Sequence, residues 1–202
     1  MMGRTGTPSR TTHTIALATV AELDGGRPLT DTAEYRASRL AARRAVQAMV
    51  PLARRVEIER RQGAAPRVIA GDGPGEQELA LSLTHRDGLA AAMVTTAPAR
   101  IGIDLEREDA IDPAHARYFL TPRERVSVRR HSLSTLWAIK EAAWKALSLN
   151  DDVAFHGLEL HLDSLGELRA VSAHGSCHAA RATIDAPWPG YVLATVRIEM
   201  SR

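Results

Sequence analysis

Three segments of this 202-residue chain recur in the same order in its second half, and this repetition restricts the folds open to it. At a nearly constant spacing, residues 40–46 align with 137–143, residues 56–58 with 158–160, and residues 88–94 with 190–196. A chance match of alanine- and valine-rich stretches is the alternative. The repetition predicts two similar halves, residues 1–98 and 99–202, with a ligand cleft between them.

Apolar periodicity and turn residues predict similar elements in both halves. The first half should contain strands at 14–23, 56–60, 79–83 and 89–95 and a helix at 32–50; the second, strands at 101–106, 158–162 and 191–199 and a helix at 133–149. This order predicts an α+β fold of two pseudo-symmetric halves, each a small antiparallel sheet packed against one long helix.

Composition favours a soluble globular protein. Hydrophobic residues make up 45% and charged residues 25%, which argues against disorder and coiled coil. The single cysteine, Cys177, excludes a disulfide scaffold and a zinc site of paired cysteines. No segment approaches the ~20 apolar residues of a membrane span. We therefore expect a cytoplasmic protein with no membrane partner.

The charge of the chain is small but dominated by arginine. The net charge is +2, and Lys140 and Lys145 are the only lysines. An arginine excess permits an anionic partner. The arginines are scattered among acids instead of forming a basic stripe, so nucleic acid is not the expected partner.

Two carboxylates lie on one face of the predicted strand 101–106. Asp104 and Glu106 alternate with Ile103 and Leu105, so the period of two places the apolar side chains on the opposite face. Gly102 allows another group to approach the backbone closely. Such a carboxylate pair suits Mg²⁺ that also binds phosphate oxygens, and a solvated acidic edge strand is the alternative.

The predicted helix 133–149 adds a third carboxylate, Glu141, and an ammonium group, Lys145. Because they are four residues apart, they can also form a surface pair worth about 0.3–0.5 kcal/mol. Both lysines of the chain lie on this helix, which favours a functional role.

These two segments together resemble the double signature of 4′-phosphopantetheinyl transferases, (I/V)G(I/V)D(I/L)E followed by WxxKEAxxKA. Residues 102–106 and 137–146 carry the two parts. Weaker resemblances are those of residues 119–124 to the F(S/T)xxE element, 82–85 to the S-x-S-H turn, 39–43 to the arginine-bearing helix, and 63–67 to the GKP segment. Thr84 replaces a serine of the family pattern, and Ala65 replaces its lysine.

The resemblance implies transfer of 4′-phosphopantetheine from coenzyme A to a serine of an apo acyl or peptidyl carrier protein, with release of adenosine 3′,5′-bisphosphate. A chain of two halves resembles the long, single-chain (surfactin-type) class, which is monomeric with one site between its halves. Fatty-acid, polyketide and peptide synthesis all remain open. Two alternatives are another Mg²⁺-dependent phosphotransferase and a non-catalytic module that binds coenzyme A or carrier protein.

The resemblance also implies roles for individual residues. Asp104, Glu106 and Glu141 would bind Mg²⁺ or Mn²⁺, and Asp104, Glu141, Lys145 and Glu124 form the expected catalytic group. Glu141, Glu124 or a metal-bound water would accept the serine proton. The residues expected to bind coenzyme A are Arg39, Arg43, Arg67, Thr84, His85, Lys140 and Lys145, with Arg67 as the substitute for the missing lysine at Ala65.

Three further segments have weaker interpretations. Residues 174–178 offer His and Cys side chains without a second cluster, so we predict a loop. Residues 71–75 are glycine-rich but lack the Lys-Ser/Thr of a phosphate-binding loop, so we predict a turn. Trp144 and residues 118–126 are candidates for contact with the carrier protein.

Overall fold

Two antiparallel sheets of five strands form the framework of the computed structural model, which describes residues 13–24, 31–59, 65–71, 76–96, 98–149 and 155–199. In spatial order, the first sheet contains β1 (His13–Thr19), β5 (Leu89–Thr96), β4 (Gln77–Arg86), β3 (Arg67–Ala70) and β2 (Val56–Glu59). The second contains β6 (Arg100–Arg107), β10 (Tyr191–Ile198), β9 (Ser176–Asp185), β8 (Leu168–Ala173) and β7 (Glu159–Leu162). The α+β prediction is confirmed.

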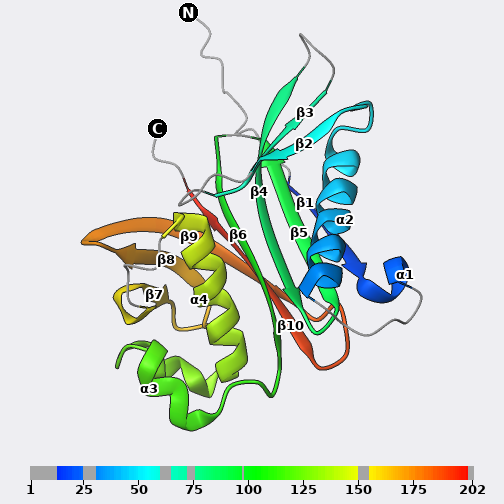
Figure 1. Cartoon of the computed structure of the whole chain (residues 1–202). Helices are drawn as coiled ribbons and strands as arrows, with labels where there is room; N and C mark the ends of the chain where they lie inside the picture. Colours follow the sequence, from blue (N-terminus) through cyan, green and yellow to red (C-terminus); the bar gives the residue numbers. More distant parts are fainter. Residues whose placement is uncertain are drawn as a thin grey trace, which may run out of the picture.

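The two sheets have the same topology. In each, the first strand lies at one edge, a long helix follows it, and the remaining four strands return in order towards that edge. The helices are α2 (Asp31–Met49) and α4 (Leu133–Leu147), drawn in blue and yellow-green in Figure 1. The aligned sequence segments fall on α2 and α4, β2 and β7, and β5 and β10, so the two pseudo-symmetric halves are confirmed.

Small residues allow both helices to pack closely on their sheets. Ala37, Ala41 and Ala45 of α2 are fully buried in the first core, and Ala138 and Ala142 of α4 are fully buried in the second. Alanine combines high helix propensity with a short side chain, so helix and sheet approach each other closely. Ser132 caps the start of α4 by accepting a hydrogen bond of 3.1 Å from the Thr135 backbone N–H.

Gly102 on β6 marks a close approach between a helix and a sheet. A Cβ at this position would lie 1.8 Å from the carbonyl oxygen of Ala142, in the middle of α4. No side chain can be accommodated at that distance. The sequence-based expectation that Gly102 admits a neighbouring group is therefore confirmed, and the group is the backbone of α4.

The two halves meet through an apolar layer between the sheets. Ile103 and Leu105 of β6 pack with Met93 of β5 and Leu193 of β10. These side chains are at most 2% exposed. The predicted alternation along β6 is confirmed: its apolar face forms the layer between the halves and its acidic face is left for other partners.

Strand β1 ends earlier than predicted. The strand expected at 14–23 stops at Thr19, and Val20–Asp24 forms the short helix α1. The reason is that β5, the partner of β1, begins at Leu89, opposite Thr19. Beyond that point there is no strand to pair with, and the Val20 backbone N–H donates to the carbonyl of Gly88 instead.

Three strands were not predicted, namely β3, β8 and β9. The loop expected at 174–178 is only partly correct: His174 and Gly175 form a turn with φ of 51° and 74°, and Ser176 begins β9. Of the turn expected at 71–75, residues 72–75 lie outside the described part of the chain. These strands escape prediction because tertiary pairing, not local periodicity, specifies them.

Short helical turns connect β6 to α4 and α4 to β7. They are η2 (Pro113–His115), α3 (Ala116–Phe119), η3 (Glu124–Arg129) and η4 (Phe155–Gly157). Over the described ranges, the chain contains no helix long and apolar enough to cross a membrane.

Candidate phosphate and metal site

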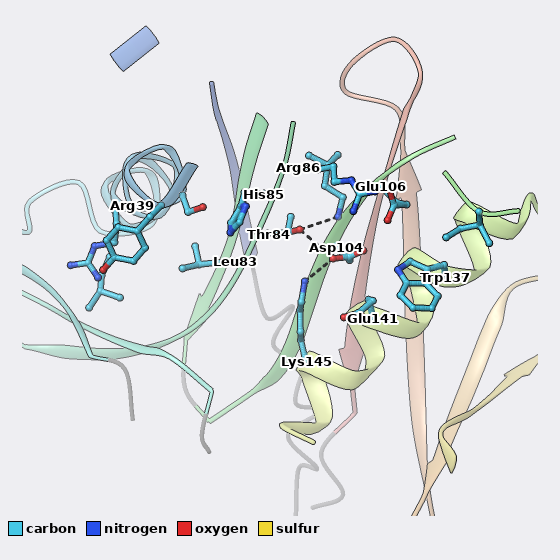
Figure 2. A pocket seen from close by; sticks show the side chains of 15 residues that line it. Arg39, Leu83, Thr84, His85, Arg86, Asp104, Glu106, Trp137, Glu141 and Lys145 are labelled. Carbon is cyan, nitrogen blue, oxygen red and sulfur yellow. Dashed lines mark hydrogen bonds and ion pairs between the residues drawn. The ribbon is translucent and has the colours of Figure 1, made fainter. Parts of the chain in front are cut away.

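A cavity of about 510 Å³ opens where the two halves meet. Figure 2 shows that α2 and β4 of the first half face β6 and α4 of the second across it. The charged and polar side chains lining it are Ser38, Arg39, Thr84, His85, Arg86, Asp104, Glu106, Glu141 and Lys145. Acidic and basic groups thus meet in one space, from segments far apart in sequence.

The acidic face of β6 forms one wall of this cavity. Asp104 and Glu106 are 7% and 4% exposed, and both line the cavity together with Glu141 of α4. The strand is held there because its apolar face is buried between the halves and Gly102 lets α4 lie against it.

Two hydroxyl groups of β4 satisfy the outer edge of β6. The backbone N–H of Ile103 donates to Ser82 Oγ, and that of Leu105 donates to Thr84 Oγ1, each over 3.1 Å. Thr84 in turn donates to Asp104 Oδ1 at 3.2 Å. β6 is an edge strand, so these contacts replace the backbone partners it would otherwise lack. They also connect the two halves beside the cavity.

The hydroxyl of Thr84, which is expected to bind phosphate, already has two partners. It donates to Asp104 Oδ1 and accepts from the Leu105 N–H, so donation to a phosphate would replace the contact with Asp104. Its phosphate role stays a prediction, and in this structure Thr84 positions the Asp104 carboxylate.

Two cations neutralise the carboxylates of β6. Lys145 Nζ donates to Asp104 Oδ1 at 2.7 Å and to the Ile103 carbonyl at 3.1 Å. Arg86 Nη2 lies 3.1 Å from Glu106 Oε1. The Lys145 and Arg86 side chains are 30% and 45% exposed, so both can also reach a ligand in the cavity.

Burial and mutual repulsion favour the protonated forms of two carboxyl groups. Burial is the main cause that raises the pKa of Glu141; the charge of Asp104 raises it further, whereas Lys145 lowers it. The pKa of Glu106 is also raised, again mainly by burial, while the Arg107 N–H and Arg86 oppose this. A cation among these groups would relieve the cost of their charges.

The carboxylates that line the cavity fit a hard divalent ion, although they are not close enough together to form a complete metal site. Three carboxylates line one cavity, and oxygen ligands of this kind suit Mg²⁺. Across the described ranges, no three His, Cys, Asp or Glu side chains are close enough to hold a metal ion as they stand. Asp104 is engaged by Lys145 and Glu106 by Arg86 instead.

The first half contributes two predicted ligand-binding residues to the cavity. Arg39 of α2 and His85 of β4 both line it. The Arg39 guanidinium lies 5.9 Å from the ring centroid of Tyr35, another lining residue. His85 Nδ1 lies 3.2 Å from Glu34 Oε2. Each basic group therefore has a partner on α2.

Lys140 and Glu124, for which the resemblance implies coenzyme A binding and catalysis, lie outside the cavity lining. They form an ion pair of 2.7 Å in which both side chains are completely buried, and neither lines the cavity. Glu124 also accepts from the backbone N–H groups of Leu160 and Thr121. In this structure the two groups neutralise each other away from the cavity, and the roles that the resemblance implies for them stay predictions.

Arg43 and Arg67 also lie outside the cavity lining. Arg67 of β3 pairs with Glu59 of β2 at 2.8 Å and with Glu78 of β4 at 3.3 Å. Its suggested role as substitute for the lysine missing at Ala65 stays a prediction. Arg86 is the basic lining residue that sequence reasoning missed, although it directly follows the Ser-Leu-Thr-His element.

An apolar recess adjoins the charged cavity. Its volume is about 360 Å³, and it shares Ile111 and Trp137 with the larger space. Trp137 stacks on Phe155 at 4.8 Å between centroids, and Trp144 stacks on Phe155 at 5.2 Å. The recess therefore has rigid aromatic walls one helical turn from Glu141.

Fold and site together define a class: a two-halved α+β protein with acidic and basic groups converging where the halves meet. Residues 100–196 match the ACPS family model, the 4′-phosphopantetheinyl transferase superfamily. The second half of the chain is therefore similar to that superfamily.

Comparison with solved structures gives a weaker likeness. The crystal structure of Thermotoga maritima holo-[acyl-carrier-protein] synthase (AcpS) aligns with 22% identity and a TM-score of 0.41. The alignment covers 51% of this chain and 65% of the synthase, less than two thirds of its length. No curated protein matched the chain.

Proposed function

We propose that this protein transfers 4′-phosphopantetheine from coenzyme A to a serine of an apo acyl or peptidyl carrier protein and releases adenosine 3′,5′-bisphosphate. The observation that carries the proposal is the convergence of Asp104, Glu141 and Lys145 in the cavity between the halves. Phosphoryl transfer is mostly positioning and charge neutralisation, and these groups suit both tasks.

Asp104, Glu106 and Glu141 are the residues that would hold Mg²⁺ or Mn²⁺. When bound, such an ion supplies charge neutralisation for the diphosphate and its leaving oxygen. Lys145 and Arg86 would then exchange their carboxylate partners for phosphate oxygens, because both side chains are partly exposed to the cavity.

Glu141 is the proposed acceptor of the serine proton. Its carboxyl group lines the cavity, whereas Glu124 is buried against Lys140. A serine hydroxyl is a weak nucleophile at neutral pH, so a carboxylate next to the reacting phosphate assists the attack.

His85 and Arg39 are the proposed partners of the remaining phosphates and of the adenine end of coenzyme A. Both come from the first half and line the cavity, and in the view of Figure 2 His85 lies between Arg39 and Asp104. The apolar recess beside Trp137 would receive the dimethyl group of pantetheine, which lies only a few bonds from the transferred phosphate.

The acceptor side of the proposal rests on charge and exposure. Tyr118 and Val126 are 61% and 69% exposed next to the recess and η3. Three arginines lie within residues 117–126, namely Arg117, Arg123 and Arg125. Glu124, the acidic residue among them, is buried. A basic surface with exposed apolar side chains suits an acidic carrier protein. Trp144 is turned inward to Phe155 and is a weaker candidate for this contact.

We further propose that the chain is of the long, single-chain (surfactin-type) class, with functional halves 1–98 and 99–202. On this proposal it acts as a cytoplasmic monomer with one site. The similar topology of the halves and their shared cavity support one site per chain.

The experiment is the intact mass of an apo acyl carrier protein after incubation with this protein, coenzyme A and Mg²⁺, with an EDTA control. We expect a gain of one phosphopantetheine group that EDTA abolishes. No gain on an acyl or a peptidyl carrier protein would contradict the proposal. Uptake of coenzyme A without transfer would instead identify a binding module, the second candidate, which the missing lysine at Ala65 favours.

A further inference from the structure

Glu34, near the start of α2, contacts the β4–β5 hairpin at two points. Its Oε2 lies 3.2 Å from His85 Nδ1, and its Oε1 accepts a hydrogen bond of 2.9 Å from the Gly88 backbone N–H. The Glu34 side chain is only 15% exposed. A carboxylate this buried, with two specific partners, has a fixed position.

The hairpin turn itself has other anchors. Asp87 and Gly88 have φ of 50° and 80° in a two-residue turn. The Gly88 carbonyl accepts from the Val20 N–H at 2.8 Å, and Asp87 accepts from the Tyr191 hydroxyl at 3.0 Å. The turn is thus anchored by α1 and by β10. The contact between Glu34 and the His85 imidazole is therefore not needed to hold the backbone of the turn.

We propose that Glu34 is a positioning residue that acts through His85. A carboxylate beside Nδ1 keeps a proton on that nitrogen and fixes the ring plane, so that the ring, when protonated on both nitrogens, can donate its Nε2–H to an anionic ligand in the cavity. The proposal rests on the proposed function, in which His85 binds the 3′-phosphate of coenzyme A. Glu34 belongs to none of the sequence segments that resemble the family.

The test compares the binding of coenzyme A and dephospho-coenzyme A, which lacks the 3′-phosphate, by calorimetry. The proteins are the unchanged chain, Glu34→Ala, His85→Ala and the double variant. Glu22→Ala is the matched control, because Glu22 also pairs with a cation across two elements but lies outside the cavity.

We expect the unchanged chain to prefer coenzyme A by about tenfold or more. Glu34→Ala and His85→Ala should each lose most of this preference, and the double variant should lose no more than His85→Ala alone. Glu22→Ala should retain the preference in full.

A second readout is the ¹⁵N signal of the His85 ring nitrogens, which reports where the protons lie. Glu34→Ala should move the proton away from Nδ1, and Glu34→Gln should do so less, because its amide oxygen can still accept from Nδ1–H. Equal weakening of both ligands in Glu34→Ala, or an undiminished effect of Glu34→Ala in the His85→Ala background, would overturn the proposal. If the unchanged chain binds no coenzyme A, the proposed function fails as well, and the ring signal then shows separately whether the Glu34–His85 contact exists.

Discussion

At the scale of single residues, the site depends on side chains that hold other side chains. Thr84 holds Asp104, Lys145 neutralises it, and Glu34 contacts His85. Each of these pairs joins elements far apart in sequence. The groups proposed to meet substrate are therefore only as well placed as the residues that support them.

Replacement of Thr84 by valine should destabilise the protein by about 1–3 kcal/mol, since it leaves the buried Leu105 N–H without a partner. Thr84→Ser retains the hydroxyl and is the matched control. Urea unfolding measures both variants, and equal free energies of unfolding would show that the hydroxyl contact is unimportant.

Asp104→Asn and Glu141→Gln should each reduce carrier-protein modification by about 100-fold or more, because losses of 10- to 100-fold already follow from mutating the outer partners of a metal site. Calorimetry with MgCl₂ should show weaker binding in both variants. Asp109→Asn serves as the control, since Asp109 pairs with Arg107 away from the cavity. Near-normal rates in either variant would contradict the assignment of these carboxylates.

At the scale of elements, the contact between β6 and α4 sets the geometry of the site. β6 carries Asp104 and Glu106, α4 carries Glu141 and Lys145, and Gly102 lets the two elements touch. Any displacement of α4 changes all the distances between these groups together.

Gly102→Ala should therefore reduce both stability and activity. Its Cβ would collide with the Ala142 carbonyl, and overpacking of this kind costs about 1–3 kcal/mol. Gly175→Ala is the control, because nothing lies within 4 Å of that position and only its positive φ is strained. Thermal unfolding and transfer rates should separate the two, and an active, stable Gly102→Ala variant would disprove the close packing.

The buried pair of Lys140 and Glu124 fastens α4 to η3 and β7. Lys140→Met should destabilise the fold by about 3–5 kcal/mol, since it leaves the Glu124 charge buried and unpaired. The double variant Lys140→Met/Glu124→Leu should recover part of this loss in denaturant unfolding. A Lys140→Met variant that keeps its stability but loses coenzyme A binding would instead support the phosphate role implied by the family resemblance.

At the scale of the whole molecule, neither half can bury its surface alone. Ile101, Ile103 and Leu105 lie in the apolar layer between the sheets, and the hydroxyl groups of Ser82 and Thr84 satisfy backbone N–H groups of β6. The cavity exists only when the halves are together.

A fragment of residues 99–202 should therefore not fold as a monomer, because it exposes that apolar layer to water. Circular dichroism and sedimentation would measure its structure and association, and coexpression with residues 1–98 should restore a folded complex. A compact, monomeric fragment with native helix content would contradict this expectation.

Much of the architecture could be predicted from the sequence, because it depends on local periodicity. The repeated segments indicated two similar halves, the period of two placed Asp104 and Glu106 on one face of β6, and the helix at 133–149 was close to α4 (Leu133–Leu147). Its last turn ends early because Ser148 adopts a left-handed conformation with φ of 53°. The strands β3, β8 and β9 were missed, since pairing with distant neighbours specifies them.

The amino-acid sequence specifies which chemical groups α4 carries, but the packing of the helix determines which of them reach the site. Lys140 and Glu141 are adjacent in the chain but about 100° apart around the helix. Glu141 and Lys145 line the cavity, whereas Lys140 faces Glu124. The physical reason is that helical spacing sets only the relative directions of side chains, and the docking of α4 on β6 determines which direction is the cavity.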